Sequence, residues 1–107
     1  MSASLLIKNA KIVNDGKIFE SDLRIKDQRF DTINNHISAK PQDIIIDAKG
    51  KYLLPGMIDD QVHFREPGLT HKANIATESK AAIAGGITSF IEMPNTVPQA
   101  TTQELLE

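Results

Sequence analysis

The sequence of 107 residues contains no cysteine and no tryptophan, and only 5% of its residues are aromatic. Without cysteine there can be no disulfide and no thiolate metal site, a composition compatible with a cytoplasmic protein. The scarcity of aromatic rings argues against a stacking surface for single-stranded nucleic acid.

The sequence also lacks an excess of basic residues and any long apolar run. The 12 Lys and Arg residues are outnumbered by 14 Asp and Glu, which gives a net charge of −2 at pH 7. This balance predicts neither a nucleic-acid footprint nor binding to a membrane surface. Lys8 and Lys11 interrupt the N-terminal apolar stretch, so it lacks the core of a signal peptide, and no segment is long enough to span a membrane. We expect a soluble protein.

The first half of the sequence reads as short strands separated by turns. Asn14, Asp15 and Gly16 form a hairpin signal, and Phe30 and Ile33 are candidates for inward-facing residues of a later strand. Polar residues and a proline predict a loop over 34–43. The resulting prediction is a small sandwich or a partial sheet, with strands over residues 4–8, 10–14, 17–25 and 43–47, a polar turn and a strand within 26–33, and a strand end at 52–56.

The second half changes character at Pro55. A strand, a loop, a helix over 71–84 and a second strand follow in turn, which is the order of a βαβ unit with parallel strands. Thr70 is the expected N-cap of the helix, and Gly85 and Gly86 are expected to end it.

A further helix should start at Thr101 or Thr102, one or two turns before the sequence ends. We therefore expect the N-terminal piece of a larger protein. The alternative is a complete small α+β domain.

Polar side chains gather at the end of the first strand of this unit. Side chains alternate along a strand, so Asp59, Gln61, His63 and Arg65 should share one face. Parallel pairing should bring Asn95, in the loop after the next strand, to the same end of the sheet, where α/β barrels hold their active sites. The sequence therefore predicts that His63, Arg65 and Asn95 converge on one pocket.

Each of these residues also has a purely structural interpretation. His63 could be a hydrogen-bonded structural histidine, Arg65 could form a surface ion pair with Glu66, and Asn95 could be a turn residue. Their common face and common end favour a site. His36 and His71 have no such neighbours and are interpreted as loop and helix-start residues.

The segments "LPGMIDDQVHFREPG" and "AAIAGGITSFIEMPNT" resemble the start of the dihydroorotase family, cyclic amidohydrolases of the amidohydrolase superfamily. The resemblance covers essentially the whole chain, and "FREPG" together with "MPNT" is a narrower pattern than an isolated His-x-His. It implies a β-sandwich segment over 1–54, followed over 55–107 by the first βα units of an incomplete TIM-type (β/α)8 barrel.

The resemblance also implies an activity. Enzymes of this family interconvert N-carbamoyl-aspartate and dihydroorotate in pyrimidine biosynthesis, and allantoinases generally lack the arginine of "REPG". Arg65 and Asn95 would bind the substrate carboxylate, for which a guanidinium is well suited.

His63 would be a ligand of a Zn²⁺ site, which is often binuclear and includes a carbamylated lysine. That lysine, further histidines and an aspartate acting as general acid and base would lie beyond residue 107. The chain alone should be inactive, and the full-length enzyme should be a cytoplasmic homo-oligomer.

Gln61 departs from the family pattern, because the first metal-binding histidine aligns here and a carboxamide is a weaker zinc donor. The metal site could be altered but working, or Asp59 on the same face could compensate, whereas Asp60 should point away. It could also be lost, which would leave a non-catalytic subunit that partners aspartate transcarbamoylase. We favour the altered, working site because His63, Arg65 and Asn95 remain; another cyclic amidohydrolase, such as an allantoinase, is a further alternative.

Overall fold

The computed structural model describes residues 3–107. These residues form two compact units, one up to Pro55 and the other over Gly56–Glu107, and each unit has its own sheet. Within the described residues, no helix is both long and apolar enough to cross a membrane.

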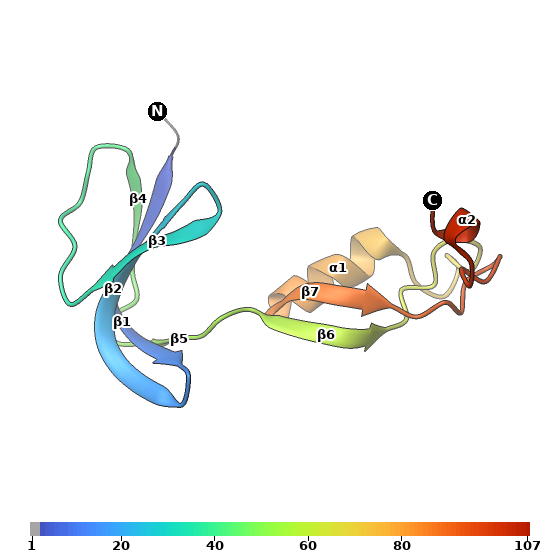
Figure 1. Cartoon of the computed structure of the whole chain (residues 1–107), viewed down its shortest axis with the longest axis horizontal. Helices are drawn as coiled ribbons and strands as arrows, with labels where there is room; N and C mark the ends of the chain where they lie inside the picture. The colour runs from blue at the N-terminus through green and yellow to red at the C-terminus, as the bar shows by residue number, and fades with distance from the viewer. Residues whose placement is uncertain (1–2) are drawn as a thin grey trace. The chain divides into compact units, whose positions relative to one another are not determined.

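The first unit is a single mixed sheet (Figure 1). Its order is β3-β2-β1-β4, and the short β5 also pairs with β1. The β1–β2 and β2–β3 pairs are antiparallel, whereas β4 and β5 both run parallel to β1. The predicted β-rich first half is therefore observed as one sheet, and a second layer that would make it a sandwich stays a prediction. The strands are β1 (Ser4–Asn14), β2 (Lys17–Lys26), β3 (Arg29–Asn34), β4 (Asp43–Asp47) and β5 (Tyr52–Leu53).

Two-residue turns join the first three strands. Asp15 and Gly16 both have positive φ, at 52° and 71°, as a hairpin turn that follows the strand twist requires, so the predicted hairpin is confirmed. Asp27 and Gln28 form a second such turn, at φ 49° and 61°, without the glycine that would have marked it. β1 is one continuous strand, because Asn9 (φ 56°) is absorbed as an irregularity rather than ending it.

The core of this unit is small. Ala10, Ile12 and Leu23 form its buried cluster. Phe30 and Ile33, expected to point inward, are 67% and 49% exposed, so that prediction was wrong. All six residues of β3 are exposed, because the described residues of this unit place no layer over it.

A buried ion pair ties β4 to the sheet. A guanidinium nitrogen of Arg24 lies 2.7 Å from Oδ2 of Asp43, and both side chains are almost fully buried. The Asp43 carboxylate also accepts hydrogen bonds from the Ser4 hydroxyl and the Lys40 amide. Because a buried charge needs several partners, this cluster fixes the register of β4 against β1.

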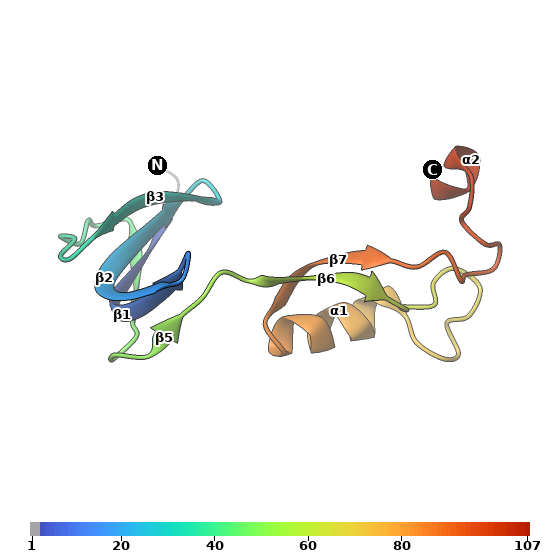
Figure 2. The same ribbon diagram turned by 60° about the horizontal axis from the view of Figure 1, so that its bottom comes forward.

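The second unit is a βαβ unit with a short final helix. β6 (Met57–Val62) and β7 (Ile87–Glu92) are parallel neighbours, and α1 (Ile75–Ala84) lies against one face of the pair (Figure 2). The predicted parallel pair is confirmed. α2 (Gln103–Leu106) begins after Thr102, as expected.

The start of α1 differs from the prediction. Asn74, not Thr70, is the N-cap, and its side-chain oxygen accepts a hydrogen bond from the Thr77 amide at 3.0 Å. The first helical amide, of Ile75, donates to the carboxylate of Glu66 at 2.9 Å. Two side chains therefore satisfy amides that have no partner within the helix. Gly85 ends the helix, as predicted.

The loops that follow β6 and β7 are fastened to each other. The Val97 amide donates to the Pro67 carbonyl at 3.0 Å. Gly68 has φ +84°, and a Cβ atom at this residue would lie 2.2 Å from the Val97 carbonyl oxygen. Phe64 packs on Phe90, with ring centroids 4.5 Å apart. The two strand ends consequently share one contact surface.

Acid should weaken the first unit. Hydrogen bonds from Arg24, Ser4 and Lys40 hold the pKa of Asp43 well below its usual value. A carboxyl group with a lowered folded-state pKa adds stability that is complete above its unfolded pKa, about 4, and is lost as the pH falls through the folded-state pKa. We expect the urea midpoint, followed by circular dichroism, to be level from pH 7 to 5 and to decrease below about pH 4.

Asp43→Asn should lower the urea midpoint at pH 7, because it leaves Arg24 buried without its charged partner. It should also make the decrease of the urea midpoint below about pH 4 smaller. Asp31→Asn is the matched control, since its carboxylate is exposed and accepts a hydrogen bond from the adjacent Thr32. Equal effects of the two substitutions would contradict the role given to the ion pair.

Gly68→Ala should destabilise the second unit by about 2 kcal/mol or more, because it adds a steric conflict to an unfavourable positive φ. Gly86→Ala separates these two effects: its φ is +90°, but nothing lies within 4 Å of its added Cβ. It should cost only about 1 kcal/mol. Urea denaturation of both variants gives the difference, and equal losses would show that the Gly68 contact with Val97 contributes nothing.

Candidate functional site

His63 and Asn95 meet at the carboxyl ends of the two parallel strands. His63 directly follows β6, and Asn95 lies in the loop after β7. Their side chains are in contact, with 2.9 Å between Nδ2 of Asn95 and Nδ1 of His63. The pairing of β6 with β7 therefore brings together two of the predicted site residues that are 32 positions apart in the sequence.

Side-chain exposure alternates around the end of β6, from Gln61 to Phe64, as predicted. Val62 and Phe64 are buried, whereas Gln61 and His63 are exposed. Arg65 lies beyond the end of β6 and has φ +66°. Strand alternation therefore does not place Arg65 on the face of Gln61 and His63, and that part of the prediction stays a prediction. The left-handed backbone turns the chain into the following loop instead.

Arg65 is half-buried and has no acidic partner in the part of the chain that the structure describes. The alternative of an Arg65–Glu66 ion pair is not observed, because the Glu66 carboxylate binds the start of α1. The Arg65 carbonyl accepts a hydrogen bond from the Leu69 amide at 3.0 Å. The backbone of Arg65 is thus tied within the loop, while its guanidinium is available for an anionic group from outside the described chain.

Asn95 has one amide atom engaged and one without a partner. Nδ2 faces His63, whereas Oδ1 is buried and has no hydrogen-bond partner among residues 3–107. With Nδ2 as the donor, the imidazole accepts at Nδ1, and a neutral ring then carries its proton on Nε2. Turning the amide over would present Oδ1 to an Nδ1–H group and leave the Nε2 lone pair free. Nε2 of His63 is the free ring nitrogen in both cases, and the orientation of the Asn95 amide decides whether it can donate a hydrogen bond or offer a lone pair.

The candidate site offers few side chains that could bind a metal ion. The described residues contain no group of three or more His, Cys, Asp or Glu side chains that could hold a metal ion. His63 offers one imidazole, and Gln61 offers only a carboxamide. Oδ1 of Asp59 accepts a hydrogen bond from the Gln61 amide at 3.1 Å, so this carboxylate is turned toward the backbone. These residues do not make up a tetrahedral zinc site by themselves.

His36 lies in the loop that precedes β4, as predicted, whereas His71, predicted as a helix-start residue, lies in the turn before the helix because α1 begins only at Ile75. Both are exposed.

The sequence analysis missed Glu92, the last residue of β7. Both of its carboxylate oxygens accept from the backbone amide of Phe64, at 3.0 and 2.9 Å. Phe64 stands between His63 and Arg65, so this contact acts on the backbone of the site. An acidic residue ending an otherwise apolar and hydroxyl-bearing strand was the available signal.

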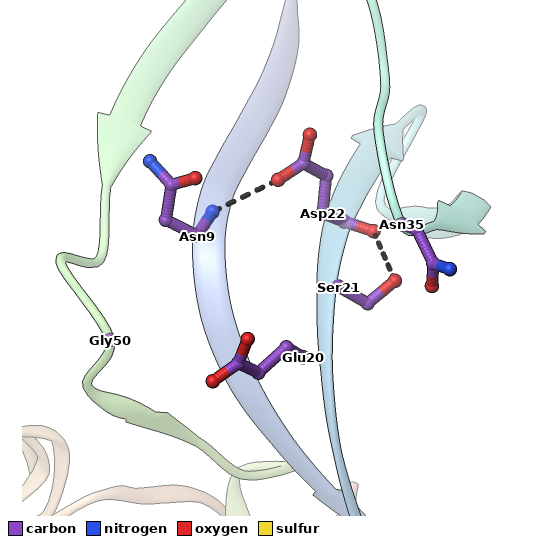
Figure 3. Close-up of a pocket in the computed structure, with 6 residues that line it drawn as sticks. All are labelled: Asn9, Glu20, Ser21, Asp22, Asn35 and Gly50. Atoms are coloured by element: carbon purple, nitrogen blue, oxygen red, sulfur yellow. Dashed lines mark hydrogen bonds between the residues drawn. The ribbon is translucent and has the colours of Figure 1, made fainter.

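A separate hollow of about 430 Å³ opens on the sheet of the first unit (Figure 3). Asp22, one of its lining residues, accepts hydrogen bonds from the amides of Asn9 and Ile37, each at 2.9 Å, and from the Lys8 ammonium group at 3.0 Å. Burial alone would raise the pKa of Asp22, but these hydrogen bonds lower it overall. The hollow thus surrounds a structural carboxylate. Its lining residues are Asn9, Glu20, Ser21, Asp22, Asn35 and Gly50.

Comparison with curated proteins finds dihydroorotases. That of Carboxydothermus hydrogenoformans is 46% identical over 96 residues, which make up 88% of this chain and 22% of that protein. That of Lactobacillus acidophilus is 39% identical over 102 residues, or 95% of this chain and 23% of the relative. The chain therefore spans less than a quarter of the length of these relatives.

Solved structures of similar fold include hydantoinases. The L-hydantoinase (dihydropyrimidinase) of Arthrobacter aurescens superposes with a TM-score of 0.89 and 33% identity, covering 98% of this chain and 23% of that one. A D-hydantoinase (dihydropyrimidinase) from Thermus sp. has a TM-score of 0.70 and 36% identity, over 84% of this chain and 20% of that one.

A family model described as dihydro-orotase-like matches residues 50–107. The match includes β6, β7 and the loops that carry His63, Arg65 and Asn95. Since it covers more than half of the chain, the chain belongs to the dihydroorotase-like family.

Proposed function

We propose that the chain is the N-terminal portion of a dihydroorotase, which catalyses the reversible cyclisation of N-carbamoyl-L-aspartate to dihydroorotate in cytoplasmic pyrimidine biosynthesis. The observation that carries the proposal is the contact between His63 and Asn95 at the strand ends, next to a half-buried Arg65 without an acidic partner. The family membership and the dihydroorotase relatives support it.

Arg65 and Asn95 are the proposed substrate-binding residues. Dihydroorotate carries a carboxylate on its ring, and a guanidinium binds a carboxylate through two parallel hydrogen bonds. Nδ2 of Asn95 has two hydrogens, so it can donate to His63 and to a bound carboxylate at the same time. The residues that move protons during the reaction belong to parts of the enzyme outside this chain, and the chain alone is expected to be inactive.

A ring amide without a carboxylate is the second candidate substrate. The similarity to an L-hydantoinase and a D-hydantoinase favours it, because the fold of these two units is shared. Arg65 favours dihydroorotate, since a neutral ring would leave a half-buried guanidinium without a partner. Hydantoin and allantoin therefore serve as the discriminating substrates. A non-catalytic subunit that partners aspartate transcarbamoylase would turn over none of them.

In the complete enzyme, β6, α1, β7 and α2 are proposed as the first βα units of a (β/α)8 barrel, with the first unit contributing to a β-sandwich. In this chain, zinc would be bound by the imidazole of His63, and its remaining ligands would come from other parts of the enzyme. Asp59 is a weaker candidate, because its carboxylate is engaged by the Gln61 amide. We also propose that the enzyme is a homo-oligomer.

The complete enzyme should form dihydroorotate from N-carbamoyl-aspartate, followed by ultraviolet absorbance. Arg65→Ala should raise the KM by about 100-fold, because it removes a bidentate charged contact that corresponds to 1.5–3 kcal/mol or more. Arg65→Lys should restore only part of the affinity, since an ammonium group lacks the planar fork. Unchanged kinetics in Arg65→Ala would rule out this role, and turnover of hydantoin but not dihydroorotate would favour the second candidate.

The chain alone should bind zinc weakly, since it offers one imidazole. Gln61→His would place two imidazoles on the same strand face, and we expect it to tighten zinc binding by about tenfold or more, or about 1.4 kcal/mol. Isothermal titration calorimetry of both proteins measures the difference. His63→Ala in the Gln61→His background is the control and should abolish the gain. Equal affinities of the unmodified chain and Gln61→His would mean that residues 61 and 63 do not face one site.

A further inference from the structure

The side chain of Glu92 takes a place that a backbone carbonyl would fill in a continuing sheet. β6 and β7 are parallel, and the Met93 amide donates to the Val62 carbonyl at 2.9 Å. In a parallel ladder, the next bond would run from the Phe64 amide to the Met93 carbonyl. The Phe64 amide donates instead to both oxygens of Glu92. The chain can therefore leave the sheet at this residue without leaving a backbone donor unsatisfied.

The segment held in this way includes a residue in an unfavourable conformation. Arg65 has φ +66°, which residues with a Cβ atom adopt rarely and keep only when their surroundings hold them there. Its carbonyl is bound by the Leu69 amide, and the preceding Phe64 is fixed by its ring, packed on Phe90, and by its amide, bound to Glu92. Glu92 is thus a side chain that restrains the backbone immediately before Arg65.

Glu92 has no cationic partner among the residues that the structure describes. It is half-buried, so its charge is partly removed from water and is compensated chiefly by the Phe64 amide. A carboxylate placed in this way contributes little to the packing of β7. Its contact serves the neighbouring strand end.

We propose that Glu92 is a positioning residue, which holds the backbone of Phe64 so that Arg65 is directed at the carboxylate of the substrate. The identity of that carboxylate rests on the function proposed above. Glu92 itself does not touch the substrate in this proposal, and its effect on binding is transmitted through Arg65.

A double-mutant cycle in the complete enzyme tests the proposal. Glu92→Ala should raise the KM for dihydroorotate by about 10- to 100-fold, as expected when a binding group is displaced by about 1 Å. In the Arg65→Ala background, the same substitution should have little further effect, because its target is already gone. A purely structural role would reduce activity by the same factor in both backgrounds, and that result would overturn the proposal.

Hydrogen exchange provides a readout that does not need turnover. Followed by mass spectrometry of the peptide that contains residues 62–69, amide exchange should be faster in Glu92→Ala than in the unmodified enzyme. Glu104→Ala, an exposed glutamate of α2 in the same unit, is the matched control and should leave it unchanged. Unchanged exchange in Glu92→Ala would overturn the proposal. If the unmodified enzyme does not act on dihydroorotate, the proposed function fails, and the exchange result alone decides whether Glu92 positions this segment.

Glu92→Gln covers the case in which Glu92→Ala does not fold. The carboxamide keeps one acceptor oxygen of the same reach, so this variant should show exchange and KM values between those of the unmodified enzyme and a variant without the contact. Exchange and KM identical to those of the unmodified enzyme would show that the charge of Glu92 is not needed, and would overturn a role that depends on it.

Discussion

The parallel pairing of β6 with β7 is the constraint on which the candidate site depends. Parallel strands end at the same edge of a sheet, so the segments that follow them emerge side by side. His63 and Asn95 meet for this reason, and so do Gly68 with Val97 and Phe64 with Phe90. No single one of these contacts spans a large area. Their common origin is the register of two six-residue strands, and a slip of that register would separate every pair.

The polar contacts at this edge divide into two groups. Asn95 and His63 join side chain to side chain, whereas Glu92 and Glu66 each bind a backbone amide, of Phe64 and Ile75. The second group fixes where the chain leaves β6 and where α1 begins. The side chains that are open to a ligand therefore stand on a backbone whose donors are already occupied, an arrangement that reduces the ordering needed when a ligand binds.

Sequence reasoning succeeded where a local signal and the topology agreed. The glycine of Asp15-Gly16 marked a hairpin, and the strand-helix-strand order was enough to predict that His63 and Asn95 would meet. It failed where tertiary contacts decided the outcome. Thr70 is an acceptable N-cap, although a weaker one than Asn74, and the Glu66 carboxylate reaches the amide of Ile75 at the start of the helix.

Sequence reasoning could not place Arg65 or identify Glu92 for a related reason. Alternation could be extended to Arg65 only if the strand continued, and strand ends depend on which backbone donors find partners across the sheet. A sequence does not show that the Phe64 amide binds a side chain rather than a carbonyl. Gln61 is the opposite case, since its departure from the family pattern is visible in the sequence itself.

The close approach of Gly68 to Val97 has a consequence for how this site can change. Two loops that touch through backbone atoms cannot be lengthened, shortened or recombined one at a time, because any insertion in one displaces the other. A new binding specificity at this edge would therefore be reached more easily by exchanging both loops as a matched set than by remodelling either alone. In protein engineering, the two loops should therefore be transferred between relatives together.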